Sequence, residues 1–73
     1  MKLTPKQNAA IDYIGRRRKN GAKIKQGSAL SRRMFEWLEQ NHLAMQNGDH
    51  VMLTWLGEKE YSKLHPRSKY RMK

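Results

Sequence analysis

Residues 38–61 of the chain read LEQNHLAMQNGDHVMLTWLGEKEY, and this stretch decides the fold because it holds a turn between two short apolar runs. The pair Asn47-Gly48 is among the strongest sequence signals for the tight turn of a β-hairpin. Such a turn between two apolar runs is typical of paired antiparallel strands. We therefore predict a two-stranded hairpin over about 43–46 and 50–53.

The register of this hairpin can follow either the turn or the apolar pattern. A two-residue turn at Asn47-Gly48 would place the apolar residues of the two strands on opposite faces, whereas a three-residue loop over 47–49 brings them to one face. Burial of an apolar side chain is worth about 1.5 to 3 kcal/mol, and propensity differences are about 1 kcal/mol or less. We therefore predict the three-residue, bulged turn. In that register Met45 pairs with Val51 and Leu43 with Leu53 on the inner face, and Ala44, Gln46, His50 and Met52 point outward.

A first helix is indicated over about 5–18. Thr4 is a good N-cap, Pro5 suits the first helical position, and Gln7 stands at the spacing of a capping box. An apolar face of about three turns follows, and the helix then runs into the basic stretch RRRK. The residues of the apolar face are Ala10, Ile11 and Ile14.

A second helix is indicated over about 28–40, and it has the clearest helical period in the chain. Ser28 or Ser31 can serve as its N-cap. Phe35 lies off the apolar stripe, so we predict that it is partly exposed as a contact for another molecule. The stripe itself consists of Leu30, Met34, Trp37 and Leu38.

The remaining segments are shorter. Residues 22–28 are too short and too charged for a helix, so we predict a loop or minor strand with Ile24 as its inward residue. A last helix over about 55–64 can be capped by Thr54, and the pair His65-Pro66 ends it. The expected fold class is therefore α+β, with a hairpin between the second and third helices.

The net charge of +10 is distributed unevenly along the chain. Residues 1–25 hold eight Lys or Arg against one acid, residues 26–64 hold four against five, and residues 65–73 hold four against none. A nearly neutral middle with basic flanks is typical of a scaffold that presents cationic surfaces to a polyanion, most often nucleic acid. The alternative is a solvated surface without a partner. We predict a single domain over 1–64 and a basic flexible tail over 65–73.

Several classes of function are not expected from this sequence. A chain of 73 residues buries only about 60 % of its unfolded surface, which leaves little room for an enclosed active site. No cysteine is present, and His42, His50 and His65 lack metal-ligand spacing, so we expect no metal or other cofactor. No nucleophile–base pair or phosphate-binding glycine loop occurs, and we expect no enzyme activity. No apolar stretch approaches the roughly 20 residues of a membrane span, so we expect a soluble, cytoplasmic protein.

The candidate nucleic-acid ligands come from the basic run, the second helix, the hairpin and the tail. The basic run and the loop after it could neutralise several phosphates, or they could form only a solvated helix end. At the start of the second helix, Ser and Arg can contact phosphates or base edges. Alternatively, Ser31 is only a cap and Arg32 pairs with Glu36 one turn later. The candidates are Arg16, Arg17, Arg18, Lys19, Lys23, Lys25, Ser28, Ser31, Arg32, Arg33, Asn47, His50, Arg67, Lys69 and Arg71.

Several short motifs stand in the order found in one family of regulators. They are Leu38-Glu39 at the end of the second helix, Leu43 at the start of the hairpin, Leu53-Thr54 at its end, and then Gly57. With these motifs, the run over 30–64 resembles the second half of winged helix-turn-helix regulators of the MarR type, and LTPKQNAAIDYI over 3–14 is similar to their first helix. Such regulators have a further helix before the recognition helix. Residues 15–27 show no pattern for it, so either that helix is missing or reduced to a turn, or the likeness is local.

The resemblance implies a compact winged-helix-like domain that binds double-stranded DNA as a small transcriptional regulator. The helix over 28–40 would enter the major groove through its N-terminal end, and the hairpin would act as the wing. The small size suits a regulator of a bacteriophage or mobile element, and such regulators often form homodimers. One alternative is a phage-type factor that binds host transcription machinery, such as RNA polymerase or its factors, through Phe35, Trp55 and the hairpin tip. Another is a non-specific RNA-binding protein.

Overall fold

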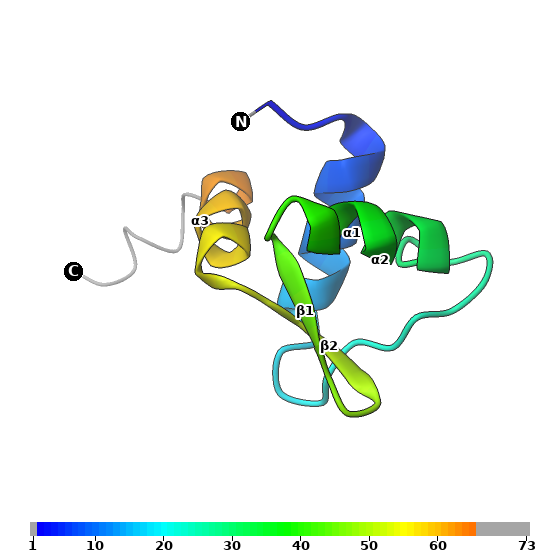
Figure 1. Cartoon of the computed structure of the whole chain (residues 1–73). Coiled ribbons are helices and arrows are strands. Elements are labelled where there is room, and N and C mark those ends of the chain that lie inside the picture. The colour runs from blue at the N-terminus through cyan, green and yellow to red at the C-terminus, as the bar shows by residue number, and fades with distance from the viewer. Residues whose placement is uncertain (1, 66–73) are drawn as a thin grey trace.

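A computed structural model of the chain describes residues 2–65 and has an α+β architecture (Figure 1). Its two strands form one antiparallel sheet between the second and third helices, so the expected fold class and element order are confirmed. In Figure 1 the hairpin extends away from the helices, and the loop that follows the first helix runs beside it. The elements are α1 (Pro5–Arg16), α2 (Arg32–Gln40), β1 (Ala44–Asn47), β2 (His50–Leu53) and α3 (Trp55–Leu64).

Helix α1 begins with the predicted capping box. The Gln7 amide donates to Thr4 Oγ1 at 3.2 Å, and the Thr4 amide donates to Gln7 Oε1 at 2.9 Å. The helix ends at Arg16, earlier than the predicted end at 18, because the chain turns at Arg17 and its amide bonds back to Ile14 O. The basic run thus leaves the helix and forms a turn.

Helix α2 starts at Arg32, and the predicted start at 28 is wrong. Ser31 is the N-cap, since its Oγ accepts from the Met34 amide at 3.2 Å. Ser28 instead closes a loop turn, where its hydroxyl donates to Lys25 O at 2.7 Å and accepts from the Leu30 amide at 3.1 Å. Those local bonds compete with helical ones and keep the segment before Ser31 out of the helix.

The buried face of α2 differs from the predicted stripe. Phe35 is only 3 % exposed, so the prediction that it forms an exposed contact is wrong. Leu30 is buried before the helix begins and does not define its face. The inward face is therefore centred on Phe35 and Leu38, with Met34 and Trp37 partly buried at its edges.

The hairpin register differs from the predicted one. Asn47 pairs with His50, which leaves Gly48 and Asp49 as a two-residue turn, and Met45 pairs with Met52. Consequently Ala44 is buried and Met45 is 48 % exposed. The predictions that Ala44 points outward and Met45 inward are therefore both wrong. The outward position of Met52 is confirmed.

The end of α2 and the start of α3 explain this register. The Leu43 amide donates to Leu38 O at 2.9 Å, and Leu43 O accepts from the Thr54 amide at 3.0 Å. His42, just before, has a positive φ of 60° that turns the chain sharply out of α2. Leu43 is thus held in the core next to the sheet, and strand alternation begins one residue later, at Ala44.

A third extended segment touches the hairpin at one point. Ala22 forms a β-bridge with Val51, whose amide donates to Ala22 O at 2.7 Å. Apart from this single bridge, residues 22–28 contain no strand or helix, so of the two predicted alternatives the loop is confirmed, and Ile24 is partly buried against the core as predicted. The structure describes every residue between α1 and α2, and this segment contains no further helix.

The core lies where α1, α2 and the inner face of the hairpin meet. Helix α3 packs beside α1, where the Tyr61 ring lies against Gly15. Within residues 2–65, no helix combines the length and the apolar character needed to cross a bilayer. The core residues are Ala10, Ile11, Ile14, Ala22, Leu30, Phe35, Leu38, Leu43, Ala44, Val51 and Leu53.

Candidate nucleic-acid interface

A hollow at the surface lies between the turn after α1 and the hairpin. The turn and the hairpin are held together by the bridge between Ala22 and Val51, so residues far apart in sequence line one concave surface. Four of the predicted candidates come together here, two from the basic run and two from the hairpin. We call this surface the basic hollow, and its lining residues are Arg18, Lys19, Asn20, Gly21, Asn47, His50 and Met52.

Gly21 and His50 form the contact that shapes the hollow. Gly21 has φ of +81°, a conformation that residues with a side chain rarely adopt. A Cβ atom at this position would overlap the His50 ring, so the ring packs directly against the glycine backbone. The imidazole is therefore held at the wall of the hollow, beside the hydrogen-bond donors of the turn.

The side chains that line the basic hollow are mostly hydrogen-bond donors. Its polar side chains are a guanidinium, an ammonium group, two amides and an imidazole, and its lining includes no carboxylate. Lys19 and Asn47 are exposed, so they are accessible to a large ligand. This combination suits a phosphate group on an extended polyanion better than an enclosed small molecule.

Arg18 connects the hollow with α3. Its Nη2 lies 2.5 Å from Glu58 Oε1, and its guanidinium carbon lies 5.5 Å from the centre of the Tyr61 ring. Both side chains of the ion pair are largely exposed, so the pair adds little stability. Its effect is to orient one guanidinium at the edge of the hollow.

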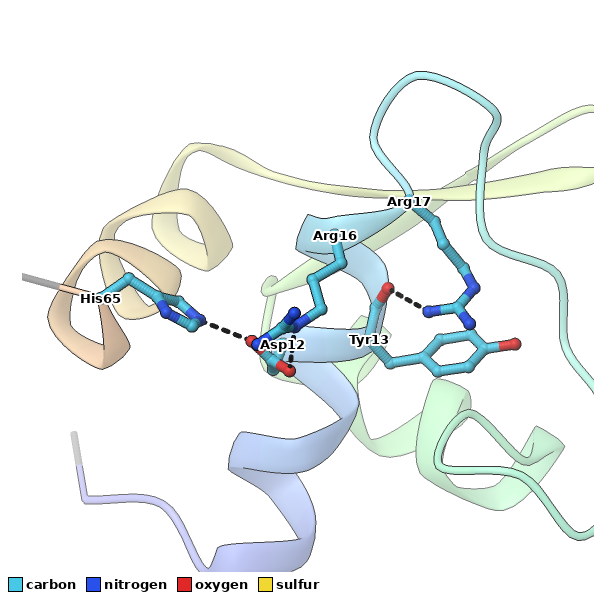
Figure 2. A network of polar contacts seen from close by, with 5 residues as sticks. All are labelled: Asp12, Tyr13, Arg16, Arg17 and His65. Atoms are coloured by element: carbon cyan, nitrogen blue, oxygen red, sulfur yellow. Dashed lines mark hydrogen bonds and ion pairs between the residues drawn. The ribbon is translucent and has the colours of Figure 1, made fainter. Parts of the chain in front are cut away.

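The other two arginines of the basic run point elsewhere (Figure 2). Arg17 lies over the Tyr13 ring, with its guanidinium carbon 3.8 Å from the ring centre. Arg16 Nε lies 2.7 Å from Asp12 Oδ2, at the side of α1 that faces His65. The predicted cluster is thus divided, because consecutive residues at the end of a helix project in different directions.

Asp12 joins α1 to the residue that follows α3. Its Oδ1 lies 2.5 Å from His65 Nε2, and its Oδ2 receives the bond from Arg16 (Figure 2). Partial burial acts to raise the pKa of Asp12, but the hydrogen bonds and positive charges of Arg16 and His65 outweigh it and lower the pKa. The same bond raises the pKa of Arg16. This network orders the end of α1 and does not line the hollow.

The first turn of α2 forms a second cationic surface. Arg32 and Arg33 are exposed directly after the cap Ser31. No ion pair joins Arg32 to Glu36 within the described part of the chain. Glu36 and Glu39 are exposed further along the helix, so a polyanion can approach only its first turn.

Beside that turn, a shallow hollow contains a lysine that the sequence analysis missed. Lys6 of α1 lies there with Ser28 and Ser31. Asn20 and Met52 in the basic hollow were also missed. Lys6 stands outside every basic run, and only the packing of α1 against the segment before α2 brings it close.

The remaining candidates are spread out or fall beyond the described structure. Lys23 and Lys25 are exposed on the segment between the two hollows. Residues 66–73, with the predicted candidates Arg67, Lys69 and Arg71 and most of the predicted tail, lie outside the described residues. Nowhere between residues 2 and 65 do three His, Cys, Asp or Glu side chains lie close enough to hold a metal ion.

Comparison with protein-family models, with curated proteins and with solved structures finds no match for this chain.

Proposed function

We propose that this protein is a small DNA-binding regulator with a winged-helix-like fold, in which the hairpin acts as the wing. The observation that carries the proposal is the basic hollow, where donors from the turn and the hairpin meet in a lining that includes no carboxylate, and where, among the described residues, only Arg18 is paired with an acid outside the lining, Glu58. The order of a helix, a hairpin and a helix supports it, and so does the family resemblance of residues 30–64. The proposed activity is binding rather than catalysis.

In this proposal the two cationic surfaces have different roles. Lys19, Asn47 and His50 contact phosphates of one strand, which positions the protein without reading sequence. Arg32 and Arg33, at the start of α2, reach base edges in the major groove, where Arg can bind guanine through two hydrogen bonds. Any sequence specificity therefore belongs to the first turn of α2.

A titration by fluorescence anisotropy tests the proposal. Labelled random duplex DNA and single-stranded RNA of equal length are each titrated with the full chain at two salt concentrations. We expect tighter binding of the duplex and a steep loss of affinity as salt rises. If neither nucleic acid binds at low salt, the DNA-binding proposal fails.

A matched pair of variants locates the contact. Lys19→Ala removes an exposed charge from the basic hollow, and Lys2→Ala removes one before the opposite end of α1. We expect Lys19→Ala to reduce the slope of log K against log salt by about 0.9, the value for one phosphate contact. Equal effects of the two variants would mean that only total charge matters.

One alternative function retains direct support from an observation. In this alternative the chain is a factor that binds transcription machinery. Trp55 is 72 % exposed, so it can serve as one of the contacts predicted for that function. Its other aromatic contact, Phe35, is buried and cannot serve. Non-specific RNA binding is the second alternative. The anisotropy titration would support it if single-stranded RNA bound as tightly as duplex DNA.

The proposal also includes a bacteriophage source, a cytoplasmic location and a homodimer.

A further inference from the structure

The start of α3 carries an exposed apolar surface on the outside of the domain. Trp55 is 72 % exposed and Leu56 is 42 % exposed. The ammonium group of Lys59 lies 4.9 Å from the centre of the Trp55 ring, so a cation stands beside the indole. A tryptophan this exposed leaves a large apolar area in water, which is typical of a contact surface.

Next to Leu56, a groove runs along α3. Its floor includes Leu43, which is buried in the core, and its rim is formed by charged residues of the helix. We call it the α3 groove, and it shares no residue with the basic hollow. The lining residues are Leu43, Leu56, Lys59, Glu60 and Lys63.

The rim of the α3 groove presents positive charge. Glu60 is only 14 % exposed at its side chain, and Lys63 Nζ lies 3.3 Å from its carboxylate. The other acid of the helix, Glu58, is held by Arg18. Among residues 2–65, no ion pair joins Lys59 to a carboxylate. Both carboxylates of α3 are therefore paired within the chain. Lys59, Glu60 and Lys63 together leave the rim one net positive charge, and the exposed Lys59 is its cation without an ion pair.

We propose that the α3 groove binds an acidic amphipathic segment of another protein. The segment is a helix whose apolar side chains at positions i, i+3 and i+7 lie against Leu56 and the Trp55 indole. Its Asp and Glu residues meet Lys59 and Lys63 at the rim. Trp55 is the main anchor, because exposed tryptophans carry much of the binding energy of interfaces.

Charge argues against two other occupants of the groove, and the apolar floor argues against a third. A second copy of this chain also carries +10, and residues 66–73 carry four Lys or Arg and no acid. Both would bring more positive charge to Lys59 and Lys63. Nucleic acid has the correct sign, but a duplex offers no apolar side chain for Leu43 and Leu56. The acidic protein segment satisfies both the apolar floor and the cationic rim.

Anisotropy of a labelled synthetic peptide tests this proposal independently of DNA binding. The probe is an acidic helical peptide with Leu at i, i+3 and i+7, and the second probe has Ser in place of each Leu. We expect the full chain to bind the first probe and to lose most affinity for the second. Trp55→Ala should weaken binding of the first probe by at least about tenfold.

Met45→Ala is the matched control, because Met45 is also an exposed apolar residue, 48 % accessible, on the outer face of the hairpin, and lines neither the basic hollow nor the α3 groove. We expect it to leave peptide affinity unchanged and Trp55→Ala to leave duplex affinity unchanged. No binding of the peptide at low salt overturns the proposal, as does an equal loss in both variants. Protection of Trp55 from a soluble quencher by duplex DNA, or by dimer formation of the chain alone, also overturns it.

Discussion

Gly57 is the residue at which α3 comes closest to the chain before the hairpin. A Cβ atom at this position would overlap the carbonyl oxygen of Leu43, a backbone group that is already bonded to the Thr54 amide. Because this oxygen of Leu43 belongs to the backbone, it cannot rotate away as the end of a side chain could. Gly57 is therefore required by the close packing of the helix against this backbone and not by its own dihedral angles.

Overpacking usually costs about 1 to 3 kcal/mol, and overlap with a backbone oxygen puts Gly57→Ala at the upper end of that range. Alanine gains about 1 kcal/mol in a helix interior, so we predict that the substitution lowers the free energy of unfolding by about 2 kcal/mol. Urea denaturation followed by circular dichroism measures it. Ser62→Ala, at an exposed position of the same helix, is the control and should change stability by less than about 0.5 kcal/mol. If Gly57→Ala left the free energy of unfolding unchanged, the close packing of Gly57 against the Leu43 carbonyl would be contradicted.

Asp12 makes the stability of the folded protein depend on pH, because its stabilising contribution is lost in acid. Its pKa is lowered in the folded state, so its contribution is fully present above the ordinary value of about 3.9 and is lost as pH falls through the lowered value. We predict that Asp12→Asn is less stable than the wild type at neutral pH and that the difference narrows in acid. Thermal unfolding at a series of pH values measures it. A constant difference down to strong acid would show that the carboxylate charge is irrelevant.

The hairpin is the part of the fold in which the structure differs most from the sequence-based prediction. Asn47-Gly48 and the apolar runs predict the hairpin and its second strand, but the predicted three-residue turn, the bounds of the first strand and the register are wrong. The predicted register places Leu43 in the first strand, whereas its backbone bonds to Leu38 and Thr54 hold it outside β1. The bond between Leu43 and Thr54 links the residues on either side of the hairpin, so the local apolar pattern does not indicate it.

Two neighbouring substitutions test the observed register. Met45→Gln changes an outward residue and should alter the free energy of unfolding by less than about 0.5 kcal/mol. Ala44→Gln introduces a large polar side chain into the core and should cost about 2 kcal/mol or more. Urea denaturation of both variants decides the question. In the bulged register the two results would be exchanged.

The same reasoning explains what could be foreseen of the helices and the candidate site. Caps at Thr4, Ser31 and Thr54 are local signals, and all three were identified, although Ser28 competed with Ser31. The direction of side chains beyond the helix end was not foreseeable. Arg17 turns onto Tyr13 and Arg18 onto Glu58, because packing decides where each lies.

At the scale of the whole molecule, the two proposed surfaces are separate. The basic hollow is lined by the turn after α1 and by the hairpin, whereas the α3 groove is lined by α3 and Leu43. We predict that duplex DNA and the acidic peptide bind at the same time, each with an affinity changed less than about threefold by the other. Anisotropy of the labelled peptide with saturating unlabelled duplex measures this. Strong competition would indicate that the peptide enters the basic hollow.

The bridge between Ala22 and Val51 also has a consequence during protein synthesis. The lysine and arginine side chains of the turn leave the ribosome well before the hairpin does, because the hairpin lies later in the chain. Until Val51 has emerged and paired, the nascent chain carries this positive charge without the assembled basic hollow. The completed hollow exists only in chains whose hairpin has formed, so the phosphate binding that we propose for it would report correct folding.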